Sequence, residues 1–227
     1  MAESRALRLV TPPSYAVRRV ILIADGFAGG GERMSGAAVQ LRTLDALRGA
    51  PLWVHLRDHG VDADTFREAA GPFVKRIRAV QLIGLVSVNT HLDIAEEFGT
   101  AIHVGQRGPS VAEARQRLGE DATVSASVHT IEEAKEAVEQ GAGTVLFSPV
   151  FPTDSKPGHP GMGLAALRAC CEAVPEAHVA ALGGITPDRM SPCLKAGALT
   201  VAVLSGILYA SRPSEAAARY HAHLRRP

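Results

Sequence analysis

Two hydroxyl groups and one amine lie close together in the segment SPVFPTDSKPGHPGMG. They belong to Thr153, Ser155 and Lys156, and Pro152 and Pro157 flank them. Hydroxyl and ammonium groups donate hydrogen bonds to phosphate oxygens. The prolines restrict the backbone, so that less conformational entropy is lost when the segment binds a ligand. By composition alone, an exposed loop whose polar residues are incidental is almost as consistent with this segment as a phosphate-binding loop. Its place beside the glycine turns described next favours phosphate binding.

Turns that contain glycine follow two short apolar runs in the last quarter of the chain. Gly183 and Gly184 stand in ALGGITPDR, and Ser205 and Gly206 stand in VAVLSGI. Because glycine has no Cβ atom, its amide can approach an anion closely, and a helix that begins behind it presents further N–H groups. Two such turns predict a phosphate site, whereas one Gly-Gly pair by itself would indicate only a tight turn.

Four histidines lie at or near the ends of apolar runs, where an imidazole can accept and return a proton near neutral pH. His55 and His59 alternate with Arg57, so the three side chains are predicted on the same face of a strand. His103 and His129 lie near the ends of later runs. For each histidine, the alternative is a hydrogen-bonded structural role.

A glycine-rich stretch, DGFAGGGER, follows the first apolar run and covers residues 25–33. Glycine clusters of this kind can bind nucleotide phosphates, but a P-loop also needs a lysine and a serine or threonine at fixed spacing. This stretch lacks both, so we interpret it as a loop at the rim of the site.

Short runs rich in valine, isoleucine and leucine alternate with stretches of helical spacing. Helix starts are predicted at Asp62 or Asp64, at Thr130 with Glu133, and at Thr186 with Pro187. Strands are expected at residues 19–24, 52–56, 81–86, 101–104, 123–127, 144–147, 178–182 and 200–204.

This alternation predicts parallel β–α units. Eight units in 227 residues favour an α/β fold of the closed (β/α)8 barrel type over a doubly wound sheet. We expect one barrel domain over residues 18–227, preceded by an N-terminal extension over residues 1–17. In such barrels the functional residues lie at the C-terminal ends of the strands, where the groups described above fall in the sequence.

The composition is ordinary for a globular protein, with 46% hydrophobic and 21% charged residues. A net charge of +1 gives no electrostatic reason to expect nucleic acid or an anionic membrane as a partner. No apolar run is long enough for a transmembrane helix and no signal-peptide pattern is present, so a cytoplasmic location is expected. Cys170, Cys171 and Cys193 lack the spacing of a metal site.

The segments VHLRD, SASVHT, FSPVFPTDSKPG, ALGGITPDR and VAVLSGI occur in this order along the chain. Together they resemble the thiamine phosphate synthase/TenI family from about Val20 to Ile207. The resemblance implies a (β/α)8 barrel and ligands of thiamine biosynthesis. Synthases of this family join a pyrimidine pyrophosphate to a thiazole phosphate and release pyrophosphate. TenI-type members instead tautomerise a thiazole carboxylate phosphate.

Several positions match the family's ligand-binding residues. The resemblance implies substrate binding by Asn89, Ser127, His129, Thr153, Ser155 and Lys156. It implies phosphate binding by Gly183 and Gly184, and the second glycine turn adds Ser205 and Gly206. Arg57 matches an arginine at the end of the second strand.

Two departures from the synthases concern metal binding. Synthases carry magnesium-binding aspartates at the positions of Thr90 and Gly108, and magnesium requires oxygen ligands. We therefore expect no cofactor, with Mg2+ required only if the chain is a synthase. His55 and His59 also replace a synthase glutamine and lysine. In the opposite direction, PTDSKPG is closer to the synthases, and Pro149 stands where TenI-type members can carry a histidine.

These departures predict a TenI-like thiazole tautomerase, an isomerase that binds a phosphorylated thiazole without a metal. His59 and, second to it, His55 are the expected acid–base groups, with Arg57 holding the carboxylate. Two alternatives are a thiamine phosphate synthase, a transferase with an altered metal site, and a non-catalytic regulator that binds a phosphate ligand. No nucleic acid or membrane partner is expected, and the sequence leaves open whether the chain forms a homo-oligomer.

Overall fold

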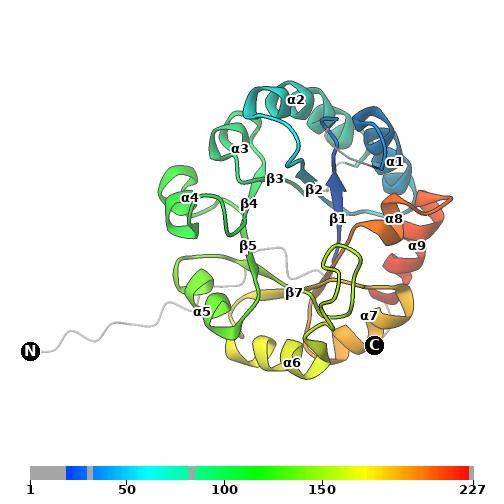
Figure 1. The fold of residues 1–227 in the computed structure, drawn as a ribbon. Coiled ribbons are helices and arrows are strands. Elements are labelled where there is room, and N and C mark those ends of the chain that lie inside the picture. The colour runs from blue at the N-terminus through cyan, green and yellow to red at the C-terminus, as the bar shows by residue number, and fades with distance from the viewer. Residues whose placement is uncertain (1–18, 30–32, 82–84, 225–227) are drawn as a thin grey trace, which may run out of the picture.

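The fold is a closed barrel of eight parallel strands surrounded by helices (Figure 1). The computed structural model describes residues 19–29, 33–81 and 85–224. The strands are hydrogen-bonded in chain order, and the last strand pairs with the first to close the barrel. The predicted (β/α)8 barrel is thereby confirmed. The predicted extension over residues 1–17 lies outside the described residues.

The strands agree closely with the predicted runs at all positions but the third. Their bounds are β1 Arg19–Asp25, β2 Trp53–Arg57, β3 Val86–Asn89, β4 Ala101–Val104, β5 Val124–Val128, β6 Thr144–Phe147, β7 His178–Leu182 and β8 Thr200–Val203. The prediction of a strand over residues 81–86 is wrong, since β3 begins only at Val86. Gln81 instead ends the preceding helix, and its side-chain amide bonds the N–H and the C=O of Leu52. Residues 82–84 lie outside the described residues.

The helices form a ring around the strands (Figure 1). Their bounds are α1 Gly36–Gly49, α2 Ala63–Val80, α3 Leu92–Phe98, α4 Val111–Leu118, α5 Ile131–Glu139, α6 Gly163–Ala173, α7 Pro187–Lys195, α8 Ser205–Leu208 and α9 Pro213–Leu224. Among these described helices, none combines the length and the apolar composition needed to cross a membrane.

The predicted helix starts are correct in position but differ in chemistry. Asp62 caps α2, since its carboxylate accepts a hydrogen bond from the Thr65 amide at 2.8 Å. Thr130 caps α5 in the same way, by accepting from the Glu133 amide at 3.0 Å. Thr186 is the N-cap residue of α7 and Pro187 is its first residue, as predicted, but the Thr186 side chain makes no capping hydrogen bond.

Two apolar clusters stabilise the barrel, because alternate residues of a strand point to opposite faces. The larger cluster lies between strands and helices and includes Leu22, Val54, Phe66, Phe73 and Leu167. The smaller cluster contains Ile21, Ile23, Trp53, Leu146, Ala180 and Ala202, which alternate with strand residues of the first. Polar residues occupy the interior on the side of β2 to β5, where His55, Ser87, His103 and Ser125 are buried.

Helices α1 and α9 close the ring by packing against each other (Figure 1). Gly49, the last residue of α1, touches the backbone at the start of α9: a Cβ atom added to it would lie 1.9 Å from the Ser214 carbonyl oxygen. The Asp45 carboxylate accepts a hydrogen bond from the Ser214 amide at 3.1 Å. Arg42 donates to the Leu208 carbonyl at 2.6 Å. The first helix therefore holds the last elements of the barrel in place.

Gly49→Ala is expected to destabilise the protein, although alanine is normally favoured over glycine in a helix. The new methyl group would overlap the start of α9, and such overpacking lowers the free energy of unfolding by about 1–3 kcal/mol. Urea denaturation measures the change. Gly105→Ala is the control, since nothing lies within 4 Å of a Cβ atom at that position. Equal destabilisation by both substitutions would contradict the packing explanation.

Candidate active site

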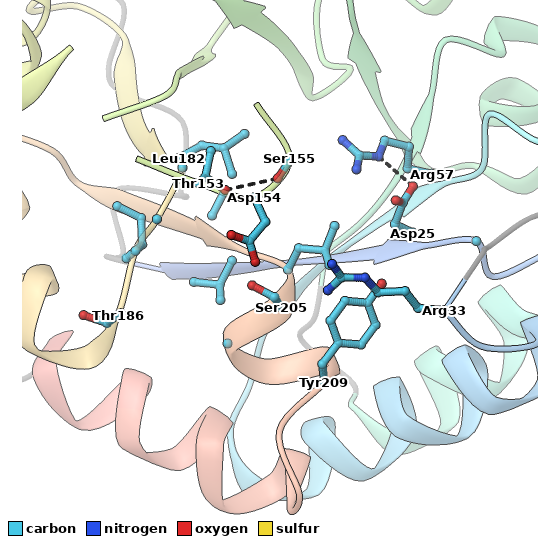
Figure 2. Close-up of a pocket in the computed structure, with 18 of the residues that line it drawn as sticks. Asp25, Arg33, Arg57, Thr153, Asp154, Ser155, Leu182, Thr186, Ser205 and Tyr209 are labelled. Carbon is cyan, nitrogen blue, oxygen red and sulfur yellow. Dashed lines mark hydrogen bonds and ion pairs between the residues drawn. The ribbon is translucent and has the colours of Figure 1, made fainter. Parts of the chain in front are cut away.

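A pocket of about 570 Å³ opens at the C-terminal ends of the strands. Most of its lining comes from the ends of β1, β2, β6, β7 and β8 and the segments that follow them (Figure 2), and Arg189 of α7 and Tyr220 of α9 also belong to it. Of the residues predicted for the site, it brings together Arg57, His59, Thr153, Ser155, Gly183, Gly184, Ser205 and Gly206. The predicted residues that are not in its lining are His55, Asn89, Ser127, His129 and Lys156.

The β7 turn needs both of its glycines. Gly183 and Gly184 have φ values of +99° and +61°, a left-handed region that residues with side chains rarely adopt. A Cβ atom on Gly183 would lie 2.7 Å from Cα of Pro149, and one on Gly184 would lie 2.4 Å from the Pro152 carbonyl oxygen. The predicted reason for these glycines was room for an anion. The structure adds a second reason, since the turn packs directly against the loop after β6.

Tyr220 of α9 supports both glycine turns from below. Its hydroxyl donates a hydrogen bond to the Ile185 carbonyl at 2.9 Å. A Cβ atom on Gly206 would lie 2.2 Å from the same hydroxyl oxygen, so only glycine fits above it. Burial raises the pKa of Tyr220 to about 12, which keeps the hydroxyl protonated as a donor. A residue of the outer ring thus positions the loops after β7 and β8.

Arg189 joins the loops after β6 and β7. It donates a hydrogen bond to the Gly184 carbonyl at 2.7 Å. Its guanidinium carbon lies 4.6 Å from the centroid of the Phe151 ring, which is a cation–π contact. Because this arginine is engaged on both sides, its role is to hold the two loops together.

The predicted ligand-binding residues of the loop after β6 lie in two parts of the barrel mouth. The hydroxyls of Thr153 and Ser155 are hydrogen-bonded to each other at 3.1 Å and belong to the pocket lining (Figure 2). The Lys156 ammonium instead lies 3.5 Å from Nε2 of His129. The two hydroxyls therefore line the pocket, whereas the Lys156 amine lies next to it, beside His129.

His129 is held in a defined orientation. Its Nδ1 lies 2.5 Å from the Ser148 carbonyl oxygen, which can only accept, so Nδ1 carries the proton in the neutral ring. Nε2 then has the free electron pair and faces the Lys156 ammonium. The His129 amide donates to the Glu133 carboxylate. This imidazole is thus held in place just after β5, and its Nε2 faces the loop after β6.

Arg57 is fixed by a partner that the sequence motifs did not indicate. Its Nε lies 2.8 Å from an Asp25 carboxylate oxygen, and both residues line the pocket (Figure 2). The neighbouring Asp58 accepts hydrogen bonds at 3.0 Å from the amides of Ala28 and Gly60. This carboxylate joins the loops after β1 and β2, so it organises the rim on that side.

The predicted common strand face of His55, Arg57 and His59 is only partly correct, because β2 ends at Arg57. His59 lies beyond the strand and is exposed at the pocket. His55 is 3% exposed inside the barrel, next to His103, with the two ring centroids 4.6 Å apart. The structure does not bring His55 and His59 together at one site.

The buried histidines belong to a hydrogen-bonded network with serines. His55 Nδ1 lies 2.9 Å from the Ser87 hydroxyl. His103 lies 2.9 Å from the Ser125 hydroxyl through Nδ1 and 2.8 Å from the Ser127 hydroxyl through Nε2. Burial lowers the pKa of His103 to about 3. Burial also holds the pKa of His55 well below its usual value, and the nearby His103 and Arg57 lower it further. Both rings are neutral, and His103 positions Ser127, which was predicted to bind substrate.

Thr90 and Gly108 lie side by side at the mouth. A Cβ atom on Gly108 would be 2.7 Å from Cγ2 of Thr90, so a methyl group takes up the space between them. The Thr90 hydroxyl donates to the Asn89 carbonyl at 2.8 Å. Asp93, the nearest carboxylate in sequence, is paired with Arg67. Within the described ranges, no three histidine, cysteine, aspartate or glutamate residues are grouped as a metal site requires.

Sequence reasoning missed five residues that shape this site. They are Asp25, Asp58, Arg189, Tyr209 and Tyr220. The rule that functional groups follow strands could have found Asp25, the last residue of β1. No local pattern marks Tyr220, since it acts through a segment far away in the sequence.

Comparisons with known proteins agree with this architecture. A family model described as thiamine monophosphate synthase matches residues 31–207. The thiamine-phosphate synthase of Anaeromyxobacter dehalogenans is 38% identical over 197 residues, which cover 86% of this chain and 78% of that protein. That of Salinibacter ruber is 37% identical over 173 residues, with 72% and 76% covered.

A solved structure, thiamine phosphate pyrophosphorylase from Pyrococcus furiosus, superposes with a TM-score of 0.76. It is 24% identical, and the match covers 91% of this chain and 95% of that one. At this level of identity the likeness concerns the fold alone. The two proteins therefore share the barrel fold over nearly the full length of both chains.

Acid is expected to destabilise the protein through His103 and His55. In the unfolded chain a histidine has a pKa of about 6.5, so below this pH the unfolded state binds protons that the folded state excludes. The free energy of unfolding should therefore fall with pH, by about 2 kcal/mol for each excluded proton between pH 7 and pH 5. Urea titrations at both pH values measure this. His103→Asn should reduce the difference and His223→Asn should not; an unchanged difference in His103→Asn would rule out this cause.

Substitutions in the two glycine turns should separate packing from ligand binding. Gly184→Ala is expected to lower stability as well as phosphate affinity, since the methyl group would meet the Pro152 carbonyl. Ser205→Ala should preserve stability but weaken the binding of a phosphate ester about tenfold, because a hydrogen bond to a charged group is lost. Thermal denaturation and calorimetric titration measure the two effects. Undiminished affinity in Ser205→Ala would argue against phosphate binding at this turn.

Proposed function

Because this chain belongs to the thiamine phosphate synthase/TenI family, an enzyme family of thiamine biosynthesis, we propose that it is a metal-independent thiazole tautomerase. Its substrate is a phosphorylated thiazole that also carries a carboxylate. The reaction moves one proton between two carbons of this molecule. A double bond shifts as the proton moves, so the reaction needs no oxidant, reductant or leaving group.

The contact between Thr90 and Gly108 carries this proposal. In the synthases, the resemblance implies magnesium-binding aspartates at these two positions. The two positions do lie together at the mouth, but one has no side chain and the hydroxyl of the other donates to the Asn89 carbonyl. Magnesium prefers carboxylate oxygens that also bridge to phosphate. The residues present do not fit this metal, and no step of the proposed reaction uses it.

Phosphate binding is assigned to the turns after β7 and β8. Gly183, Gly184, Ser205 and Gly206 line one wall of the pocket. A short helix after the last strand is a recurrent phosphate-binding feature of (β/α)8 barrels, and α8 has this place. Thr153 and Ser155 face the same pocket and offer further hydroxyl donors. These groups would hold the phosphate end of the substrate.

The carboxylate of the substrate is assigned to Arg57. Asp25 orients its guanidinium through Nε, which leaves the terminal nitrogens for a bidentate bond to a carboxylate. Fixing both acidic ends of a small molecule orients the ring between them for proton transfer. His59 lies beside Arg57 in the pocket lining, where it would contact the bound ligand.

We propose His129, rather than the expected His59, as the acid–base group, because its ring orientation is fixed. Proton transfer requires an imidazole held in one orientation, with a nitrogen that faces the reacting atoms. The Ser148 carbonyl accepts from Nδ1 of His129, which leaves the electron pair on Nε2, 3.5 Å from the Lys156 ammonium. His55 is buried, so direct contact with a substrate at the mouth is excluded in this conformation. His129 would remove and return the proton, with Lys156 stabilising the negative charge that develops.

A thiamine phosphate synthase is the second candidate, and the comparisons favour it by name. The curated relatives described above are synthases at 37–38% identity. The hydroxyls and the lysine of the loop after β6 also match that group. This reaction would need carboxylates other than those at positions 90 and 108. The pocket has three, Asp25, Asp58 and Asp154, but the first two already bind an arginine and backbone amides.

Activity in the presence of a chelator distinguishes the two reactions. We expect conversion of the thiazole carboxylate phosphate, followed by NMR in D2O, to proceed at the same rate with excess EDTA. Formation of thiamine phosphate from a pyrimidine pyrophosphate and a thiazole phosphate, observed only when magnesium is supplied, would refute the tautomerase.

Histidine variants test the mechanism within the same assay. His129→Asn should lower turnover by roughly 100-fold or more, the size typical of a lost general base, with little effect on substrate binding. His59→Asn should weaken binding more than turnover. The reverse pattern would assign proton transfer to His59.

A further inference from the structure

Arg33 is a cationic residue of the pocket to which neither the motifs nor the family resemblance gives a role. It ends the glycine-rich stretch after β1 and lines the pocket together with Ser205 and Tyr209. Its guanidinium carbon lies 5.3 Å from the centroid of the Tyr209 ring, a cation–π contact. Figure 2 shows the guanidinium over this ring and directed into the pocket. The aromatic ring thus keeps the positive charge at the cavity.

Each of the two other arginines of the pocket lining has a hydrogen-bonding partner within the protein. Arg57 is paired with Asp25, and Arg189 donates to the Gly184 carbonyl while it lies over Phe151. For Arg33, the described part of the chain provides the Tyr209 ring and no carboxylate or carbonyl partner. A ring contact uses the face of the guanidinium and leaves its N–H groups at the edge. These donors are therefore available to a ligand in the pocket.

The groups around Arg33 define the ligand that would fit. Ser205 offers a hydroxyl from the last strand, and the β7 turn at Gly184 lines the same cavity. Asp154, in the loop after β6, directs its carboxylate into this space (Figure 2). A bound anion would be attracted by Arg33 and repelled by Asp154. Removing the charge of Arg33 should therefore weaken anion binding, and removing the charge of Asp154 should strengthen it.

We infer that Arg33 binds the phosphate group of the substrate, from the side opposite the β7 turn. This inference rests on the proposed function and makes its substrate class more specific: the ligand is a phosphate monoester, and the first loop of the barrel contributes to its recognition. A planar guanidinium can donate two parallel hydrogen bonds to phosphate oxygens, whereas an ammonium cannot. Tyr209 positions this fork. Arg33 thereby favours the phosphorylated thiazole over the corresponding alcohol.

Calorimetric titration of the full chain tests this with two probes, a hydroxyethylthiazole phosphate and the unphosphorylated hydroxyethylthiazole. Arg33→Gln should weaken binding of the phosphate about tenfold or more and leave binding of the alcohol unchanged. Arg33→Lys should recover only part of the loss, because the charge remains but the fork is absent. Asp154→Asn should strengthen binding of the phosphate. Arg48→Gln is the matched control, since Arg48 is exposed in the last turn of α1. This turn leads into the start of β2 and so lies away from the C-terminal ends of the strands, where the pocket opens.

The outcomes separate this inference from the proposed function. Equal losses for the two probes, or no loss for either, would overturn the role of Arg33. If the wild-type chain binds inorganic phosphate in a manner that depends on Arg33 but does not bind the thiazole phosphate, the phosphate role stands and the thiazole function fails. If it binds neither thiazole phosphate nor inorganic phosphate, both are refuted.

Discussion

The close packing of the β7 turn against the loop after β6 determines the shape of the barrel mouth. Gly183 and Gly184 leave no room for a side chain between the two loops. Tyr220 reaches the same turn from α9 through its hydrogen bond to Ile185. Since α9 is in turn packed on Gly49 of α1, contacts on the outside of the barrel help to fix the loops to which phosphate binding is assigned. A rigid support of this kind suits a site that must hold a small anion in one place.

The barrel interior is divided into an apolar part and a polar part, with different physical consequences. The polar part contains His55 and His103, whose hydrogen bonds to serines compensate for their removal from water. Such a network is stable only while both rings stay neutral, which links the stability of the fold to pH. It also gives Ser127 a fixed partner in His103. The interior of this barrel thus contributes to the arrangement of its mouth, although His55 and His103 are not part of the pocket lining.

Thr90 and Gly108 lie together at the barrel mouth, and neither carries a carboxylate. Thr90 has a φ of +61°, a left-handed conformation that asparagine and aspartate adopt more readily than a β-branched residue. Beside it, Gly108 leaves the space that the Thr90 methyl group fills. The backbone therefore places these two positions together whether or not they carry carboxylates. Within one fold, a change of this kind in the side chains at the mouth can alter the chemistry of a site.

The barrel, most of its strands and the two glycine turns could be predicted from the sequence, because strand periodicity, helix capping and the conformational freedom of glycine are local properties. The absence of carboxylates at positions 90 and 108 is likewise visible in the sequence. Which candidate residues share a pocket depends on the three-dimensional arrangement of the strands and loops. His55 and His59 are four residues apart, yet one is buried and the other is exposed, because β2 ends between them. Arg33 and Tyr220 became visible only through partners from distant segments, and no local pattern records such contacts.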